Sequence, residues 1–175
     1  INHASVGGAL VNAGLISASH SGISLIGGAI VSGGITNTGN ITANWGIFGL
    51  VFTVAGGISN SGTISARDDA IVVAENSTFS GGVNNSGMLL GRSGIFVEAG
   101  AATFLGGVVN SGTISVAVDG ITLFLVSTFS GGISNAGTIT AGQLGIEVER
   151  LSVFAGDIVN SAHGLIHATN TAIAV

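Results

Sequence analysis

Eight carboxylates and three arginines are the side chains of this 175-residue chain with the chemistry for acid–base catalysis. The acids are Asp68, Asp69, Glu75, Glu98, Asp119, Glu147, Glu149 and Asp157. A hydrolase or lyase needs such groups clustered on one face. The best candidate cluster consists of Arg67, Asp68, Asp69, Arg92 and Asp119. These residues lie within about 10 Å of one another if their repeats stack as strands. A solvated turn with weak surface ion pairs is the simpler interpretation, so we expect no catalytic residues and no enzyme.

The remaining reactive groups do not form a recognisable site. Glu98 and Glu149 fall two repeats apart with Phe124 between them, too far for a carboxylate pair. The histidines lack a neighbouring carboxylate in the sequence, so we expect no metal site and no cofactor; they are His3, His20, His163 and His167. The chain has no cysteine, which excludes disulfides and thiolate ligands. Three arginines, no lysine and a net charge of −5 argue against a nucleic-acid partner.

A repeat of about 25 residues organises the whole chain and must position these groups. An Asn-x-Gly triplet recurs six times and a stretched copy follows, with asparagine spacings of 25, 23, 25, 25, 25 and 25. The repeated asparagines are Asn12, Asn37, Asn60, Asn85, Asn110, Asn135 and Asn160. Because asparagine and glycine favour turns, we assign this column to a turn, with glycine at positive φ and the amides stacked as a ladder.

Aliphatic columns flank each triplet and alternate with Ser, Thr or small residues. A period of two predicts strands, and such strands bury their apolar side only when identical coils stack. We therefore predict a single all-β domain over residues 1–175, a parallel β-solenoid of about seven coils and about 34 Å long. A further column ends in four aromatic residues, which we assign to a stacked core ladder: Phe79, Phe104, Phe129 and Phe154.

Two outer surfaces are candidates for partner contact. If the column of Ile47, Ile71, Ile95, Ile121 and Ile146 points inward, the adjacent positions expose an apolar patch made of Phe48, Phe96 and Phe124. A slip in strand register is the alternative, since it turns such residues inward. The second surface is a face of Thr and Ser that follows the Asn-x-Gly turn and is interrupted by Leu15, Met88, Leu90 and Leu165. A regular Thr/Ser lattice suggests ice binding, although these residues also simply suit an exposed strand.

Three repeat segments resemble the passenger-domain repeats of bacterial autotransporters, which are proteins of type V secretion. The segments are GGISNSGTISA (56–66), GGVVNSGTISV (106–116) and GGISNAGTITA (131–141). The resemblance covers essentially the whole chain and implies a right-handed parallel β-helix in an extracellular or cell-surface protein. It also implies a segment of a longer secreted protein, or a chain whose ends pack against copies of itself.

From the resemblance and the missing catalytic cluster we expect a structural or adhesive stalk. Its partners would be further copies of the chain or a glycan or protein of a host or cell surface. The alternatives are an ice-binding solenoid and, third, a polysaccharide-active β-helix enzyme. The most apolar stretch, residues 46–58, is shorter than the roughly 20 residues of a spanning helix, so we do not expect this segment to cross a membrane.

Overall fold

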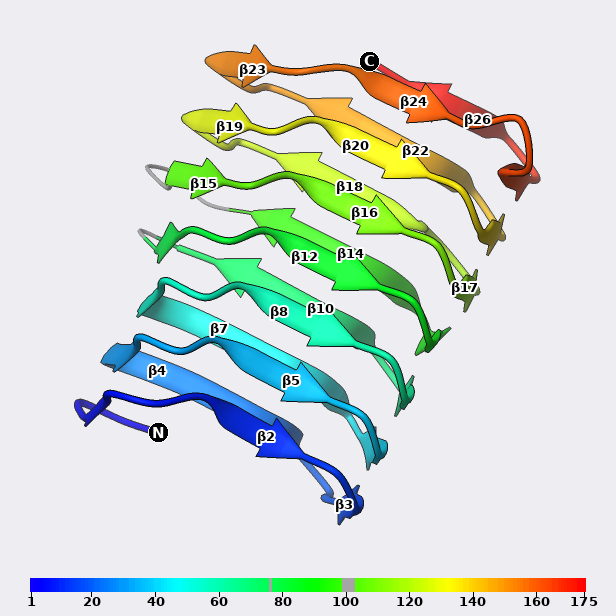
Figure 1. Ribbon diagram of the computed structural model, residues 1–175. Coiled ribbons are helices and arrows are strands. Elements are labelled where there is room, and N and C mark those ends of the chain that lie inside the picture. Colours follow the sequence, from blue (N-terminus) through cyan, green and yellow to red (C-terminus); the bar gives the residue numbers. More distant parts are fainter. Residues whose placement is uncertain (76, 99–102) are drawn as a thin grey trace.

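The computed structural model describes residues 1–75, 77–98 and 103–175. In this part of the chain all regular structure is β-strand, and the strands form three parallel sheets. Each asparagine-centred repeat makes one coil, and the coils stack in sequence order (Figure 1). The predicted parallel β-solenoid of about seven coils is confirmed.

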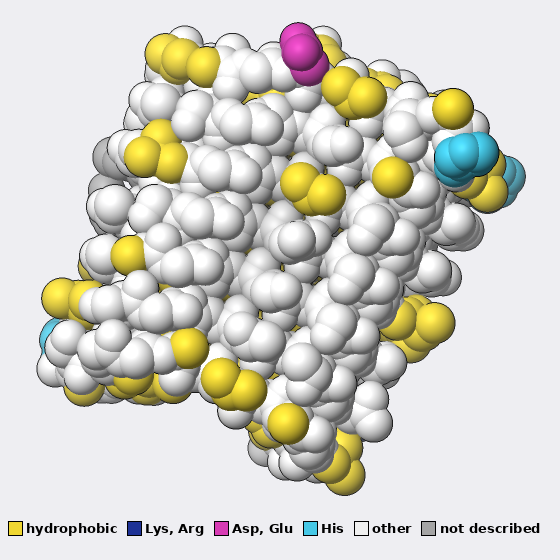
Figure 2. Space-filling view, in the orientation of Figure 1, with side chains coloured by type: hydrophobic (Ala, Val, Ile, Leu, Met, Phe, Trp, Pro, Cys, Tyr) yellow, Lys and Arg dark blue, Asp and Glu magenta, His cyan; other side chains and the backbone are white. Residues whose placement is uncertain are grey.

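The first sheet, sheet B, contributes one short strand per coil. Its strands are β2 (Leu10–Asn12), β5 (Ile35–Asn37), β8 (Ile58–Asn60), β12 (Val83–Asn85), β16 (Val108–Asn110), β20 (Ile133–Asn135) and β24 (Ile158–Asn160). Each strand ends on the repeated asparagine, and these asparagines pair in register along the sheet. The outward side of sheet B carries hydrophobic side chains scattered among small polar ones (Figure 2). Such scatter is normal for a protein surface and marks no contact site.

The second sheet, sheet C, follows the Asn-x-Gly turn. Its strands are β3 (Leu15–Ser17), β6 (Asn40–Ala43), β9 (Thr63–Ala66), β13 (Met88–Gly91), β17 (Thr113–Val116), β21 (Thr138–Ala141) and β25 (Leu165–Ala168). The central aliphatic residue of each strand points into the core, while its two neighbours face outward, as at Ile114 between Thr113 and Ser115.

The third sheet, sheet A, closes the coil and bends around a corner. Its strands are β1 (Ser5–Val6), β4 (Ser21–Val31), β7 (Trp45–Val54), β10 (Asp69–Ala74), β11 (Thr78–Phe79), β14 (Ser93–Glu98), β15 (Thr103–Leu105), β18 (Ile121–Phe124), β19 (Thr128–Ser130), β22 (Leu144–Glu149), β23 (Val153–Ala155) and β26 (Thr171–Ala174). The long strands β4 and β7 pass round the corner without a break, whereas later coils divide there into two strands. A register shift between Ile26 and Ala29 absorbs the unequal length of the first two coils.

Figure 1 also shows the direction of winding. The chain crosses the near side from left to right and the far side from right to left as it climbs from the N-terminus to the C-terminus. This winding is right-handed, as expected for crossovers between parallel strands.

The core consists of ladders of like residues, one rung per coil. The rings of Phe79, Phe104 and Phe129 are fully buried and stack with centroid separations of 4.7 and 5.0 Å. Phe154 continues the stack at 5.4 Å from Phe129 and is only half-buried. These rings pack inside the solenoid, so they provide core stability and not an outward aromatic track.

The glycine of the Asn-x-Gly turn differs from our expectation. Positive φ occurs instead in the Gly-Gly pairs, for example 73° at Gly57 and 104° and 70° at Gly106 and Gly107. The turn glycine is required because of close approach between coils. A Cβ atom on Gly112 would collide with the carbonyl oxygen of Gly87 in the preceding coil. Stacking distance, and not backbone conformation, therefore selects glycine at this position.

Candidate functional site

The repeated asparagines form a continuous chain of amide hydrogen bonds through the turn. Each Nδ2 group donates to the Oδ1 atom of the asparagine in the next coil, at 2.7–2.8 Å from Asn12 to Asn160. Asn37, Asn60, Asn85, Asn110 and Asn135 have no exposed surface. These side chains are not accessible to a ligand, so the column supports the turn.

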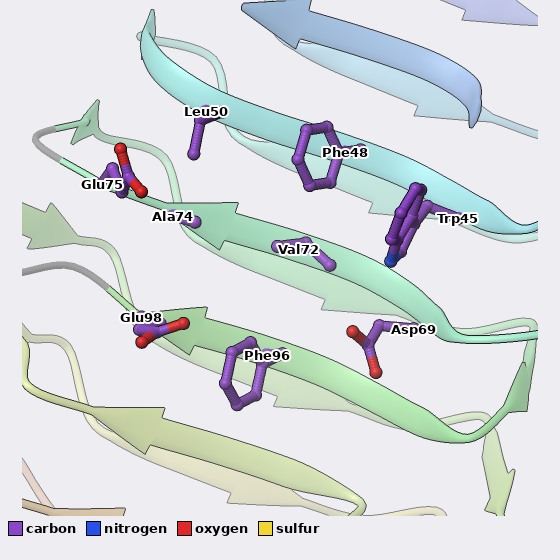
Figure 3. A pocket seen from close by; sticks show the side chains of 9 residues that line it. All are labelled: Trp45, Phe48, Leu50, Asp69, Val72, Ala74, Glu75, Phe96 and Glu98. Atoms are coloured by element: carbon purple, nitrogen blue, oxygen red, sulfur yellow. The ribbon is translucent and has the colours of Figure 1, made fainter. Parts of the chain in front are cut away.

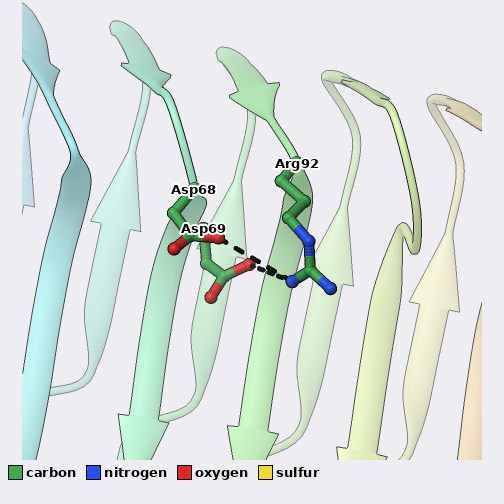
Figure 4. A network of polar contacts seen from close by, with 3 residues as sticks. All are labelled: Asp68, Asp69 and Arg92. Carbon is green, nitrogen blue, oxygen red and sulfur yellow. Dashed lines mark ion pairs between the residues drawn. The ribbon is translucent and has the colours of Figure 1, made fainter.

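The polar cluster near the start of β10 is an ion-pair network. Arg92 Nη1 lies 3.7 Å from Asp68 Oδ1 and 3.8 Å from Asp69 Oδ1 (Figure 4). Asp119 makes a different contact, because its Oδ1 atom accepts a hydrogen bond from the Leu144 backbone N–H at 3.1 Å. The arginine side chain is 57% exposed, so these long ion pairs contribute little to stability.

Asp69 nevertheless has an unusual environment. Its side chain is only 14% exposed, and its Oδ1 atom accepts no hydrogen bond. Burial raises the pKa of this carboxyl group above its ordinary value, and the nearby charges of Asp68 and Asp119 raise it further. The hydroxyl of Ser93 and the guanidinium of Arg92 act in the opposite direction. Asp69 is thus a largely desolvated carboxyl group whose charge is balanced by the long ion pair with Arg92.

Glu98 and Glu149 lie two coils apart, as the repeat predicts. Phe124 is the register partner of both Glu98 and Glu149, which separates these two acids by two coils. Within residues 1–75, 77–98 and 103–175, histidines and acids nowhere gather in threes that could hold a metal ion. Burial also raises the pKa of Glu147, and the charges of Asp119 and Glu149 add to the shift.

The Thr/Ser face is the outer surface of sheet C. One outward column contains, in coil order, Leu15, Asn40, Thr63, Met88, Thr113, Thr138 and Leu165. Its three apolar members are exposed by 71% at Leu15, 40% at Met88 and 55% at Leu165. They occupy the first, fourth and seventh positions, so equal intervals of three coils separate them.

Phe48 and Phe96 lie on the outer side of sheet A, as predicted. Val72 is the register partner of both rings, and the inward neighbours Ile95 and Val97 are fully buried. The three residues Phe48, Val72 and Phe96 therefore form one outward column, and the alternative of a register slip does not apply. Both rings are half-buried.

These two rings belong to a groove with a volume of about 300 Å³ (Figure 3). Its lining residues are Trp45, Phe48, Leu50, Asp69, Val72, Ala74, Glu75, Phe96 and Glu98. The small residues Val72 and Ala74 on β10 lie between larger ones on β7 and β14. We name this feature the β10 groove.

Phe124 is separate from the β10 groove, which corrects our prediction of one contiguous patch of three rings. It occupies the neighbouring outward column, and the Arg150 guanidinium carbon lies 5.6 Å from the centroid of its ring. Arg150 also pairs with Glu149 at 3.1 Å. Phe124 is thus covered by a cation and flanked by acids, and does not extend the apolar surface.

Three lining residues were not predicted for this surface: Trp45, Asp69 and Glu75. Trp45 contacts Phe48 with a centroid separation of 5.4 Å and closes one end of the groove. Strict alternation would place Trp45 on the inward side, since it precedes the inward Ile47 by two residues, so no sequence pattern assigned it to the groove. Its proximity to Asp69 depends on the register of β7 and β10.

Comparison of the chain with protein-family models, curated proteins and solved structures found no match. Among the residues that the structure describes, there is no helix of the length and apolar character needed to span a bilayer.

Proposed function

We propose that this chain is a rod-like, self-associating segment of a secreted bacterial surface protein, with a structural or adhesive role. The solenoid supports the rod, and the autotransporter-like repeats support the secreted, extracellular setting. The three exposed apolar residues on sheet C carry the self-association. Leu15, Met88 and Leu165 place apolar groups at equal intervals in an otherwise polar outward column, and Leu90 adds a fourth apolar residue in the neighbouring column.

This spacing is self-complementary. Coils are about 4.8 Å apart, so Leu15 and Leu165 each lie about 14 Å from Met88 along the rod. A two-fold axis through Met88, perpendicular to the rod, brings Leu15 onto Leu165 of a second copy and Met88 onto its own equivalent. Such an isologous contact is the commonest form of homodimer.

Sedimentation of Met88→Thr tests the contact. Threonine occupies the equivalent position in β9, β17 and β21, so the variant restores the repeat and should fold. We expect its dimer dissociation constant to rise about ten-fold or more, because two buried methionines are lost per dimer. Val109→Thr, on the outer side of sheet B, is the matched control and should associate like the wild type.

Cysteine pairing tests the orientation, because the chain contains no native cysteine. A mixture of Leu15→Cys and Leu165→Cys should cross-link under mild oxidation more than Leu15→Cys alone. A wild-type chain that stays monomeric at millimolar concentration, or a Met88→Thr chain that associates unchanged, would overturn the proposal.

Ice binding is a second candidate, supported by the outward Thr and Ser columns of sheet C. Met88→Thr separates the two functions. It weakens an apolar contact between copies, but it extends a threonine lattice and should increase thermal hysteresis. Absence of hysteresis in both the wild type and this variant would eliminate the ice-binding candidate.

A further inference from the structure

The β10 groove has the width of a single aliphatic chain. Its walls come from β7 and β14, which flank β10 and so lie two strand spacings, or about 10 Å, apart. Phe48 and Leu50 form one wall, and Phe96 and Glu98 form the other (Figure 3). Between them the floor drops to Val72 and Ala74, which are 5% and 7% exposed. The wall side chains occupy part of this distance, and the gap that remains between them suits a chain of methylene groups.

The groove is apolar in the middle and acidic at both ends. Trp45 and Asp69 lie where β7 and β10 begin, while Glu75 and Glu98 lie where β10 and β14 end. The Cα atoms of Asp69 and Glu75 are six residues apart along an extended strand, or about 20 Å. A ligand that satisfies both ends must therefore be elongated and carry its polar groups at its termini.

The described lining residues offer almost only hydrogen-bond acceptors. Asp69, Glu75 and Glu98 supply carboxylates, and the indole N–H of Trp45 is the only side-chain donor among the lining residues. Asp69 pairs with Arg92 at 3.8 Å and its Oδ1 atom is buried, so Asp69 acts on a ligand through its charge. The exposed Glu75 and the half-buried Glu98 can accept hydrogen bonds from a ligand directly. This set of groups favours a cationic donor and disfavours carboxylates, phosphates and most sugars, which need donors from the protein.

The apolar middle of the groove favours a cationic ligand with a polymethylene chain over a cationic peptide. An extended peptide would place its backbone N–H and C=O groups against Phe48, Phe96, Val72 and Ala74, which cannot bond them. A polymethylene chain has no such groups and buries its carbons favourably there. Ammonium groups at the chain ends are attracted to the carboxylates and to the face of Trp45.

We propose that the β10 groove binds a linear aliphatic diamine or polyamine, with one ammonium group at Trp45 and Asp69 and the other at Glu75 and Glu98. This site lies on sheet A and does not depend on the self-association proposed for sheet C.

Trp45 is the only tryptophan, so its fluorescence reports directly on the groove. We would titrate the full chain with unbranched α,ω-diaminoalkanes of increasing length at low salt. Affinity should rise about three- to four-fold per added methylene until the chain spans both acidic ends, and then level off. The monoamine and the diol of the best length should bind at least ten-fold more weakly. Affinity should also fall as salt is added.

Two variants locate the site. Ala74→Leu fills the floor and should abolish the fluorescence response, whereas Val109→Leu on sheet B should leave it unchanged. Glu98→Gln removes one terminal charge and should weaken the diamine about five-fold while leaving the monoamine nearly unaffected. Circular dichroism melting would establish that each variant folds.

Several outcomes would overturn the proposal. These are no response to any diamine, equal binding of the diol, or unchanged affinity in both Ala74→Leu and Glu98→Gln. Because Met88→Thr should retain diamine binding and Ala74→Leu should retain association, failure of either proposal is distinguishable from failure of the other.

Discussion

The Nδ2 group of Asn85 donates a hydrogen bond to the Oδ1 atom of Asn110 at 2.8 Å, and neither side chain has any exposed surface. The backbone carbonyl of Asn85 in turn accepts hydrogen bonds from Ser111 and Gly112 in the next coil, at 2.8 and 3.1 Å. Each asparagine thus links its coil to the next one through both its side-chain amide and its backbone carbonyl. Because every coil repeats this residue, the hydrogen-bond network continues along the rod.

Asn85→Ala should lower the free energy of unfolding by about 2–4 kcal/mol, because it leaves the Asn110 Oδ1 atom without a partner in a buried site and removes the shortest hydrogen bond that the Asn60 amide donates. Chemical denaturation would measure the loss. Asn84→Ala is the matched control, since Asn84 is the preceding residue and is exposed. It should change stability by less than about 0.5 kcal/mol. Equal effects at the two positions would contradict the structural role of the ladder.

Gly112→Ala should destabilise the protein strongly, by about 3 kcal/mol or more, because its Cβ atom would collide with the Gly87 carbonyl and force two coils apart. Gly14 is the equivalent residue of the first coil, and a Cβ atom there meets no neighbour within 4 Å. Gly14→Ala should therefore be nearly neutral. Thermal melting of the two variants measures the effect of stacking at equivalent turn positions, and similar losses in both would show that backbone conformation matters more than stacking.

The raised pKa of Asp69 predicts a specific pH dependence of stability. Between the ordinary carboxyl value of 3.8 and the higher pKa of the folded state, the folded protein binds more protons than the unfolded chain. The free energy of unfolding should therefore fall as pH rises through this window. Asp69→Asn removes the titrating proton and should flatten the slope.

Ser93→Ala should widen the pH window that Asp69→Asn removes. The Ser93 hydroxyl lowers the pKa of Asp69, so its removal should move the upper limit of the window to higher pH. Denaturation at a series of pH values would reveal both changes. An Asp69→Asn variant with the wild-type slope would show that other groups, such as Glu147, control the dependence.

The repeat in the sequence was sufficient to predict the architecture. Asparagine spacing gave the coil length, and alternation gave the faces, including the outward positions of Phe48 and Phe96. Alternation succeeds here because in-register stacking places each residue above its own equivalent, so one correct coil fixes all the others. The positive φ expected at the Asn-x-Gly glycine was wrong, because two structural reasons favour glycine and the sequence does not distinguish them.

The candidate site was predictable only in part. The sequence identified two aromatic rings of the β10 groove, yet it grouped them with Phe124, which Arg150 covers. Whether neighbouring outward residues make a ridge or a hollow depends on the side chains in between, and here Val72 and Ala74 are small enough to leave a groove.

By itself, the sequence determined the parallel solenoid, its seven coils, its asparagine and phenylalanine ladders and its scarcity of charge. These follow from local periodicity, which is repeated in every coil. The tertiary structure alone decided that Trp45, Asp69, Phe96 and Glu98 share one groove. Those neighbours are one or two coils apart, and only the strand register between coils brings such distant residues together.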